Sequence, residues 1–148
     1  MSTLSHTLVG AALVTLIIAG TDRGAEAAQR VDVWKSPSCS CCGNWIAYMT
    51  ANGFDVAIHD VDDVDPVKQA NGVTSDLASC HTAKIENYVV EGHVPVTDIR
   101  RLLAERPAVK GIAVPAMASG APGMGSDGSA YDVVSFDATG KTQVFAHH

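Results

Sequence analysis

The alternation of hydrophobic and polar residues predicts regular short elements from residue 30 onward. Residues 30–35 and 54–60 alternate as half-buried strands do. Between them, residues 44–51 carry apolar side chains at helical spacing, and Asn52-Gly53 is a typical helix end. These segments predict a β-α-β unit with parallel strands and a right-handed crossover.

The same signals predict a short helix, a β-hairpin, a second amphipathic helix and a second hairpin, at residues 64–70, 83–91, 95–105 and 131–146. Residues 114–128 are rich in glycine, proline and small residues and contain two methionines, which predicts a long loop. The order of elements before this loop is that of the thioredoxin fold. We therefore expect an α/β domain with a mixed sheet flanked by helices, extended by a Met-containing loop and a C-terminal hairpin.

The first 27 residues have the features of an export signal. Residues 8–19 form an apolar run that is short for a membrane span, and Ala25-Glu26-Ala27 fits a small-residue cleavage site. No lysine or arginine precedes the apolar run, so an uncleaved N-terminal anchor is the alternative. We expect residues 1–27 to be a signal peptide, residues 28–148 to be one exported, periplasmic domain, and no membrane span to remain after cleavage.

Composition argues against several classes of function. The chain has 148 residues and a formal charge of −6, and removal of the signal takes away two acidic residues and one basic residue, leaving −5. An acidic domain is not expected to bind nucleic acid. The sequence contains neither a nucleotide-binding loop nor a serine-hydrolase or metalloprotease motif, which favours a non-enzymatic protein.

The four cysteines form the most unusual feature of the sequence. Cys39, Cys41 and Cys42 lie between the first strand and the first helix, and Cys80 lies just before the first hairpin. In a thioredoxin-like topology this second loop faces the cysteine motif, so we expect all four sulfurs to meet. Disulfides between such close neighbours would enclose very short loops, which argues against a mainly structural role.

Converging thiolates suit Cu(I) or Zn(II). Zinc prefers one tetrahedral set, usually built from two separated cysteine pairs, whereas Cu(I) accepts fewer thiolates and lets sulfurs bridge. We therefore expect copper as Cu(I), with room for more than one ion. Two alternatives stay open: a thiol–disulfide oxidoreductase that uses the Cys39/Cys42 pair with Cys41 or Cys80 as resolving thiol, and a structural zinc or disulfide site.

Other side chains are candidates for accessory roles. Met117 and Met124 carry soft thioethers on the long loop, and His81 adjoins Cys80. We consider these three as accessory ligands. His93 follows the hairpin and is expected to cap the junction with the next helix.

Several motifs resemble those of the DUF411 family of CopG-like periplasmic copper-resistance proteins. They are found at residues 36–45, 52–54, 59–62, 77–83, 91–95, 113–117 and 122–124, so the resemblance extends from about Val31 to the C-terminus. The C-x-C-C motif together with Ser79-Cys80-His81-Thr82 is its most specific part. Ser40 departs from the family, in which glycine is commoner at this position.

The resemblance implies a thioredoxin-like fold and copper binding by Cys39, Cys41, Cys42 and Cys80. It also implies a role in copper homeostasis beside other periplasmic copper-handling proteins. A redox role for the bound copper is compatible with the resemblance but is not specified by it.

Overall fold

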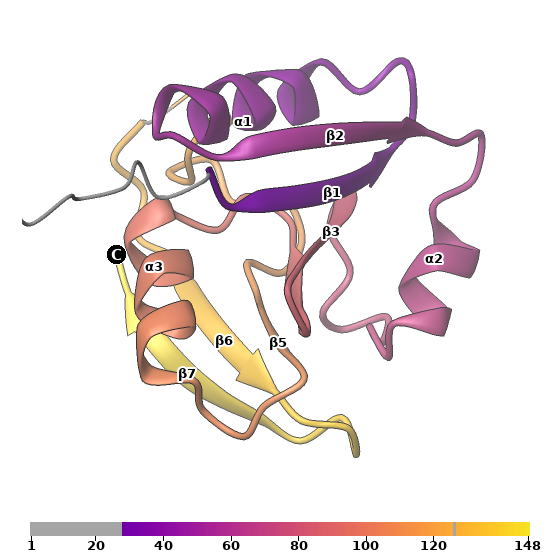
Figure 1. Cartoon of the computed structure of the whole chain (residues 1–148). Helices are drawn as coiled ribbons and strands as arrows, with labels where there is room; N and C mark the ends of the chain where they lie inside the picture. Colours follow the sequence, from indigo (N-terminus) through magenta and orange to yellow (C-terminus); the bar gives the residue numbers. More distant parts are fainter. Residues whose placement is uncertain (1–27, 126) are drawn as a thin grey trace, which may run out of the picture.

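The computed structural model describes residues 28–125 and 127–148, which form a mixed α/β domain (Figure 1). Its elements are β1 (Arg30–Lys35), α1 (Ser40–Ala51), β2 (Asp55–Asp60), α2 (Asp65–Ala70), β3 (His81–Ile85), β4 (Tyr88–Glu91), α3 (Val96–Glu105), β5 (Gly111–Ala113), β6 (Asp132–Phe136) and β7 (Thr142–His147). The predicted order of elements is confirmed, with one addition. Strand β5 was not predicted, because its three residues are too few to show a periodic pattern.

All the strands belong to one sheet in the order β2-β1-β3-β4-β5-β6-β7. Strands β1 and β2 are parallel, as predicted, and α1 connects them. Strand β3 lies antiparallel to β1 and β4, and β6 lies antiparallel to β5 and β7. Both predicted hairpins are therefore confirmed. The second parallel pair, β4 with β5, was not foreseen.

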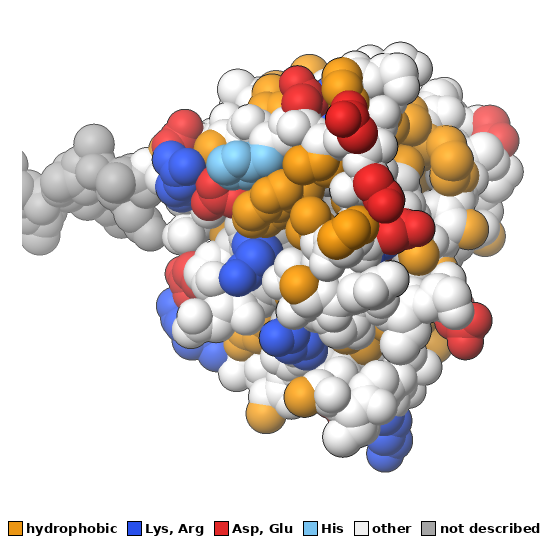
Figure 2. Space-filling model, turned by 90° about the vertical axis from the view of Figure 1, so that its right-hand side faces the viewer, with side chains coloured by type: hydrophobic (Ala, Val, Ile, Leu, Met, Phe, Trp, Pro, Cys, Tyr) orange, Lys and Arg blue, Asp and Glu red, His pale blue; other side chains and the backbone are white. Residues whose placement is uncertain are grey.

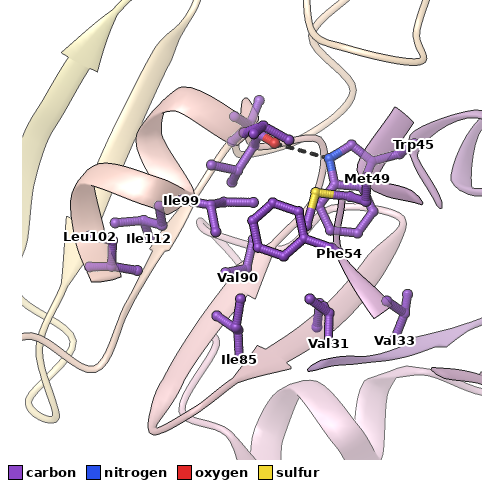
Figure 3. Close-up of a cluster of buried hydrophobic side chains, with 14 of the residues drawn as sticks. Val31, Val33, Trp45, Met49, Phe54, Ile85, Val90, Ile99, Leu102 and Ile112 are labelled. Carbon is purple, nitrogen blue, oxygen red and sulfur yellow. Dashed lines mark hydrogen bonds between the residues drawn. The ribbon is translucent and has the colours of Figure 1, made fainter. Parts of the chain in front are cut away.

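The main hydrophobic core lies where α1 and α3 pack on the sheet (Figure 3). Trp45 and Met49 of α1 and Ile99 of α3 are fully buried. The indole Nε1 of Trp45 donates to the carbonyl oxygen of Val94 at 3.0 Å, which satisfies the polar end of this buried ring. The apolar helix faces predicted from spacing are thus the buried faces.

A smaller core covers the opposite face of the central strands. Because successive strand residues point to opposite faces, Val90 joins the main core while Val89 joins the smaller one. Val73 and Leu77, from the segment after α2, cover this second face. The chain that leads into Cys80 is therefore anchored on this face of the sheet by Val73 and Leu77.

Strand β2 leaves side chains partly open on both faces of the sheet. Ile58 pairs with Val33 and therefore lies on the face of the main core, where it is 50% exposed. On the opposite face Trp34 stacks on His59, with ring centroids 4.8 Å apart. Figure 2 shows hydrophobic side chains gathered on the upper part of one face of the molecule, bordered by acidic ones.

The first helix begins earlier than predicted. It starts at Ser40, so Cys39 is its N-cap and Cys41 and Cys42 belong to its first turn. The cysteine motif is therefore part of the helix start and not a separate loop between strand and helix. The predicted signal peptide, residues 1–27, lies outside the described residues. Among the residues that are described, no helix has the length and apolar character needed to cross a membrane.

Candidate metal centre

The start of α1 presents three sulfurs, which we call the motif arm: Cys39, Cys41 and Cys42. The backbone N–H of Cys39 donates to Ser36 O at 3.0 Å, so a turn at Ser36-Pro37 directs the chain into the helix. Three-residue spacing places Cys39 and Cys42 on the same side of the first turn, with Cα atoms 5.4 Å apart. The two are joined by a disulfide, and Cys42 is fully buried.

Cys41 keeps a free thiol that faces both its neighbour and the distant cysteine. Its Sγ lies 3.5 Å from Cys39 Sγ and 4.0 Å from Cys80 Sγ. All four Sγ atoms lie within 4.8 Å of one another. The predicted meeting of the four sulfurs is therefore present in the structure, with two of the sulfurs oxidised to a disulfide.

Strand pairing brings Cys80 to this place. Strand β3 runs antiparallel to β1, and His81 is the partner of Lys35 at the end of β1. Cys80, one residue before His81, therefore lies beside the segment that leads into α1. Cys80 forms the second arm of the site together with His81 and His93. We call these three residues the hairpin arm.

The two histidines of the hairpin arm are buried against the Cys80 sulfur. His93 Nε2 lies 3.1 Å and His81 Nδ1 lies 3.5 Å from Cys80 Sγ. Burial lowers the pKa of His93, and lowers that of His81 well below 6.5, with further contributions from His93 and Lys68. Both imidazoles are thus neutral at pH 7, which is the form that binds metals.

The structure overturns the prediction for His93. Helix α3 begins at an N-cap of Pro95, without a side-chain cap. His93 instead turns toward Cys80, and its Nδ1 donates to Pro122 O at 2.7 Å. Spacing alone pointed to the helix because His93 stands only two residues before Pro95.

The environment of Cys80 favours its neutral thiol. Burial raises the pKa of Cys80 to about 12, and the nearby Cys41 sulfur adds to the rise. A metal ion that binds Cys80 must displace this proton, since only the thiolate is a good ligand. A soft cation would reverse the electrostatic balance that keeps the thiol protonated.

A buried ion pair holds the loop before Cys80. Lys68 Nζ of α2 lies 2.5 Å from Glu91 Oε1, and both side chains are almost completely buried. The same carboxylate accepts the Ser79 N–H at 2.7 Å and the Thr82 hydroxyl at 2.7 Å. Residues on both sides of Cys80 and His81 are therefore fixed by one acidic side chain.

The long loop lies beside the hairpin arm. Ser79 Oγ donates to Ala116 O at 2.5 Å, and the Ala116 N–H donates to Ala78 O at 3.0 Å. At the other end of the loop, Gly123 has φ +83°, and a Cβ there would lie 2.8 Å from Trp45 N. Only glycine combines this conformation with so close an approach to α1.

The loop methionines differ in burial. Met117, next to Ala116, is 56% exposed, whereas Met124 packs against the main core. Their assignment as accessory ligands remains a prediction.

The donor set suits a soft or borderline ion. Ligands around a three-coordinate ion with metal–sulfur bonds of about 2.3 Å lie roughly 4.0 Å apart. The 4.0 Å between Cys41 and Cys80 Sγ matches this spacing. Thiolates and neutral imidazoles are the ligands that copper and zinc select, whereas calcium and magnesium select oxygen.

Sequence reasoning missed three residues of this region: His93, Lys68 and Glu91. One signal was available for Glu91, because an acidic residue that directly follows Tyr88-Val89-Val90 in a short strand needs a buried partner. No signal in the sequence named Lys68 as that partner, since the two residues are brought together only by the packing of α2 on the sheet.

Comparisons with known proteins show which proteins the chain resembles. A family model described as "Protein of unknown function, DUF411" matches residues 77–124, which include the hairpin arm but not the motif arm. Two solved structures, described as "Copper resistance protein copG" in form 2 and form 1, are both 41% identical in sequence to this chain. Each match covers 82% of this chain and 98% of the other, with TM-scores of 0.77 and 0.76. Among curated proteins, none matches the chain.

Proposed function

From the premise that this chain belongs to the DUF411 family, we propose that it is a copper-binding protein of copper resistance. It holds Cu(I) through Cys39, Cys41, Cys42 and Cys80. One observation supports this proposal most directly. The Sγ atoms of Cys41 and Cys80 lie 4.0 Å apart, although the two residues are 39 positions apart in the sequence. The relatives described as copper resistance proteins support copper over zinc.

Full use of the site requires reduction of the Cys39–Cys42 disulfide. A thiol reductant supplies two electrons and two protons, its own two thiols become a disulfide, and the protein gains two free thiols. Four cysteines then face one another, and bridging sulfurs give room for more than one Cu(I) ion. The protein sequesters copper or holds it for transfer to other copper-handling proteins.

The proposal includes a fold type and a location. The order β1-α1-β2 followed by the β3-β4 hairpin and α3, with cysteines at the start of α1, supports a thioredoxin-like fold. The apolar run and cleavage pattern of residues 1–27 support export to the periplasm.

An anaerobic titration of reduced protein with Cu(I), in competition with a chromophoric chelator, tests the copper proposal. We expect at least one tightly bound ion per chain and a large loss of affinity in Cys80→Ser. Ser40→Ala, an exposed substitution in the same helix turn, is the control and should bind as the wild type does. Equal binding by Cys80→Ser and wild type would refute the four-cysteine site.

A second candidate function is thiol–disulfide exchange by Cys39 and Cys42. The disulfide between them is the observation that favours it. This function predicts that metal-free protein turns over a disulfide substrate and that Cys42→Ser traps a mixed disulfide through Cys39. An inert metal-free protein would exclude it.

A further inference from the structure

Strand β2 forms one edge of the sheet (Figure 1). Among residues 28–125 and 127–148 it pairs with β1 alone. Proteins commonly protect such an edge by placing charged side chains or prolines within the edge strand. The centre of β2 is instead the uncharged run Val56-Ala57-Ile58, and Ile58 is one of the large hydrophobic residues that stay exposed. This edge is therefore open to pairing with another extended chain.

The hydrogen bonds to β1 show which backbone groups of β2 are unpaired. The Asp55 N–H donates to Gln29 O at 3.0 Å, and the Val61 N–H donates to Lys35 O at 2.9 Å. Because alternate residues of a strand bond to the same neighbour, the odd-numbered residues of β2 face β1 and the even-numbered residues face outward. The outward-facing residues are Val56, Ile58 and Asp60. Each of them offers one N–H donor and one C=O acceptor at the edge.

The side chains of β2 offer contacts on both faces of the sheet. Val56, half-buried, and Ile58, exposed, lie on the face of the main core. Ala57 and His59, both half-buried, lie on the opposite face. A strand added beside β2 would place its own alternate side chains next to these two pairs. Apolar residues are the best match on the face that exposes Ile58.

Acidic residues lie at both ends of the edge. Asp55 starts the strand, Asp62 and Asp63 follow its end, and all three are exposed and form no ion pair with another described residue. Asp60, by contrast, is paired with Lys35 at 2.8 Å. Lysine or arginine at the ends of an added strand would complement the unpaired charges. A second copy of this chain would bring the same acidic residues to the edge, and like charges across paired strands are destabilising.

We propose that the β2 edge binds an extended segment of a partner protein, which joins the sheet through main-chain hydrogen bonds. The partner segment alternates apolar and polar residues and carries lysine or arginine at both ends. This inference goes beyond the proposed function, because it does not require copper. The end of β2 pairs with Lys35, after which the chain leads into α1, so the partner would lie near the end of the sheet that carries the candidate metal centre.

Hydrogen exchange of individual amides, followed by NMR, tests strand addition directly. The probe is a short synthetic peptide in which valine and threonine alternate between paired lysines, added at about 1 mM. We expect the N–H groups of Val56 and Ile58 to exchange more slowly when the peptide is present. Those of Ala57 and His59 already face β1 and should change little. Absence of protection, or protection confined to other parts of the chain, would overturn the proposal.

Two substitutions at exposed residues form a matched pair. Ile58 on β2 and Val144 on the opposite edge strand, β7, are 50% and 52% exposed, so lysine at either position should leave the fold intact. Ile58→Lys removes an apolar contact and opposes the basic peptide with a like charge, so it should weaken binding by about tenfold or more. Val144→Lys should bind as the wild type does. Equal binding by the two variants would contradict docking at β2.

Two further measurements identify the occupant of the edge. The same peptide with glutamates in place of its lysines should bind more weakly, and equal binding would overturn the assignment of a basic partner. Sedimentation of the protein alone should show a monomer. A dimer that Ile58→Lys dissociates would assign the edge to a second copy and overturn the proposal. None of these measurements involves copper, so their failure would leave the proposed function standing.

Discussion

The two arms of the candidate site are built in opposite ways. In the motif arm, three sulfurs lie within four residues, and one helix turn positions them. In the hairpin arm, Cys80 and His93 come from separate segments, and strand pairing, a buried ion pair and the long loop hold them together. The comparison teaches that the first arm depends on local geometry and the second on the integrity of the whole fold.

Breaking the ion pair behind the hairpin arm should have the largest effect on stability. Lys68→Met leaves the Glu91 carboxylate buried without its cation, so we expect the free energy of unfolding to fall by about 3–5 kcal/mol. Urea denaturation measures this change. Lys84→Met, at an exposed lysine of β3, is the control and should change little. If Lys68→Met were as stable as the control, the ion pair would not support this arm.

The Cys80 thiol should react slowly in the folded protein. Because its pKa is raised to about 12 from an ordinary 9.0, little thiolate exists at pH 8. Metal-free protein should be alkylated at Cys80 by iodoacetamide about 100-fold or more slowly than in urea, since the thiolate is the reactive form. Peptide mass spectrometry after timed quenching measures both rates. Equal rates would show that the fold does not protect this sulfur.

Chemical reduction of the disulfide in the motif arm should lower the free energy of unfolding much less than loss of the ion pair does. The Cys39–Cys42 disulfide closes a loop of only a few residues, so its reduction should lower the free energy of unfolding by about 2 kcal/mol or less. Urea denaturation of metal-free protein, with and without a phosphine reductant, measures the difference. Complete unfolding upon reduction would contradict this and would favour a structural disulfide.

The buried histidines should make the stability of the fold depend on pH, with a smaller effect than the changes above. The pKa of His81 is well below 6.5 in the folded protein, so the unfolded state binds more protons as the pH falls below about 6.5. Stability is therefore complete above that pH and declines below it, with His81 contributing about 1 kcal/mol of loss between pH 7 and 5.5. Urea denaturation of metal-free wild type and His81→Gln at both pH values measures it. The loss should shrink in the variant, and an equal loss would assign the effect to other groups.

The contrast between the arms also explains what the sequence could reveal. The motif arm and the meeting of Cys80 with it were predictable, because element order places both loops at the same end of the sheet. The roles of His93, Lys68 and Glu91 were not predictable. Their partners, Cys80, Pro122 and one another, are fixed by packing of segments distant in sequence.

The hydrophobic pattern also failed to predict one very short strand and the first turn of one helix. Strand β5, Gly111–Ala113, lacks enough residues for a periodic signal. The start of α1 was placed too late, because Ser40, Cys41 and Cys42 have no strong helix propensity and the first turn is set by the cap at Cys39.

A double-mutant cycle on Cu(I) affinity tests most directly whether the two arms hold the same ion. Affinities of reduced wild type, Cys41→Ser, Cys80→Ser and the double variant would be measured by anaerobic chelator competition. If Cys41 and Cys80 bind one shared ion, the losses will not add, and the double variant will bind little worse than either single variant. Strictly additive losses would mean that each arm binds copper independently, and would contradict a site built from both.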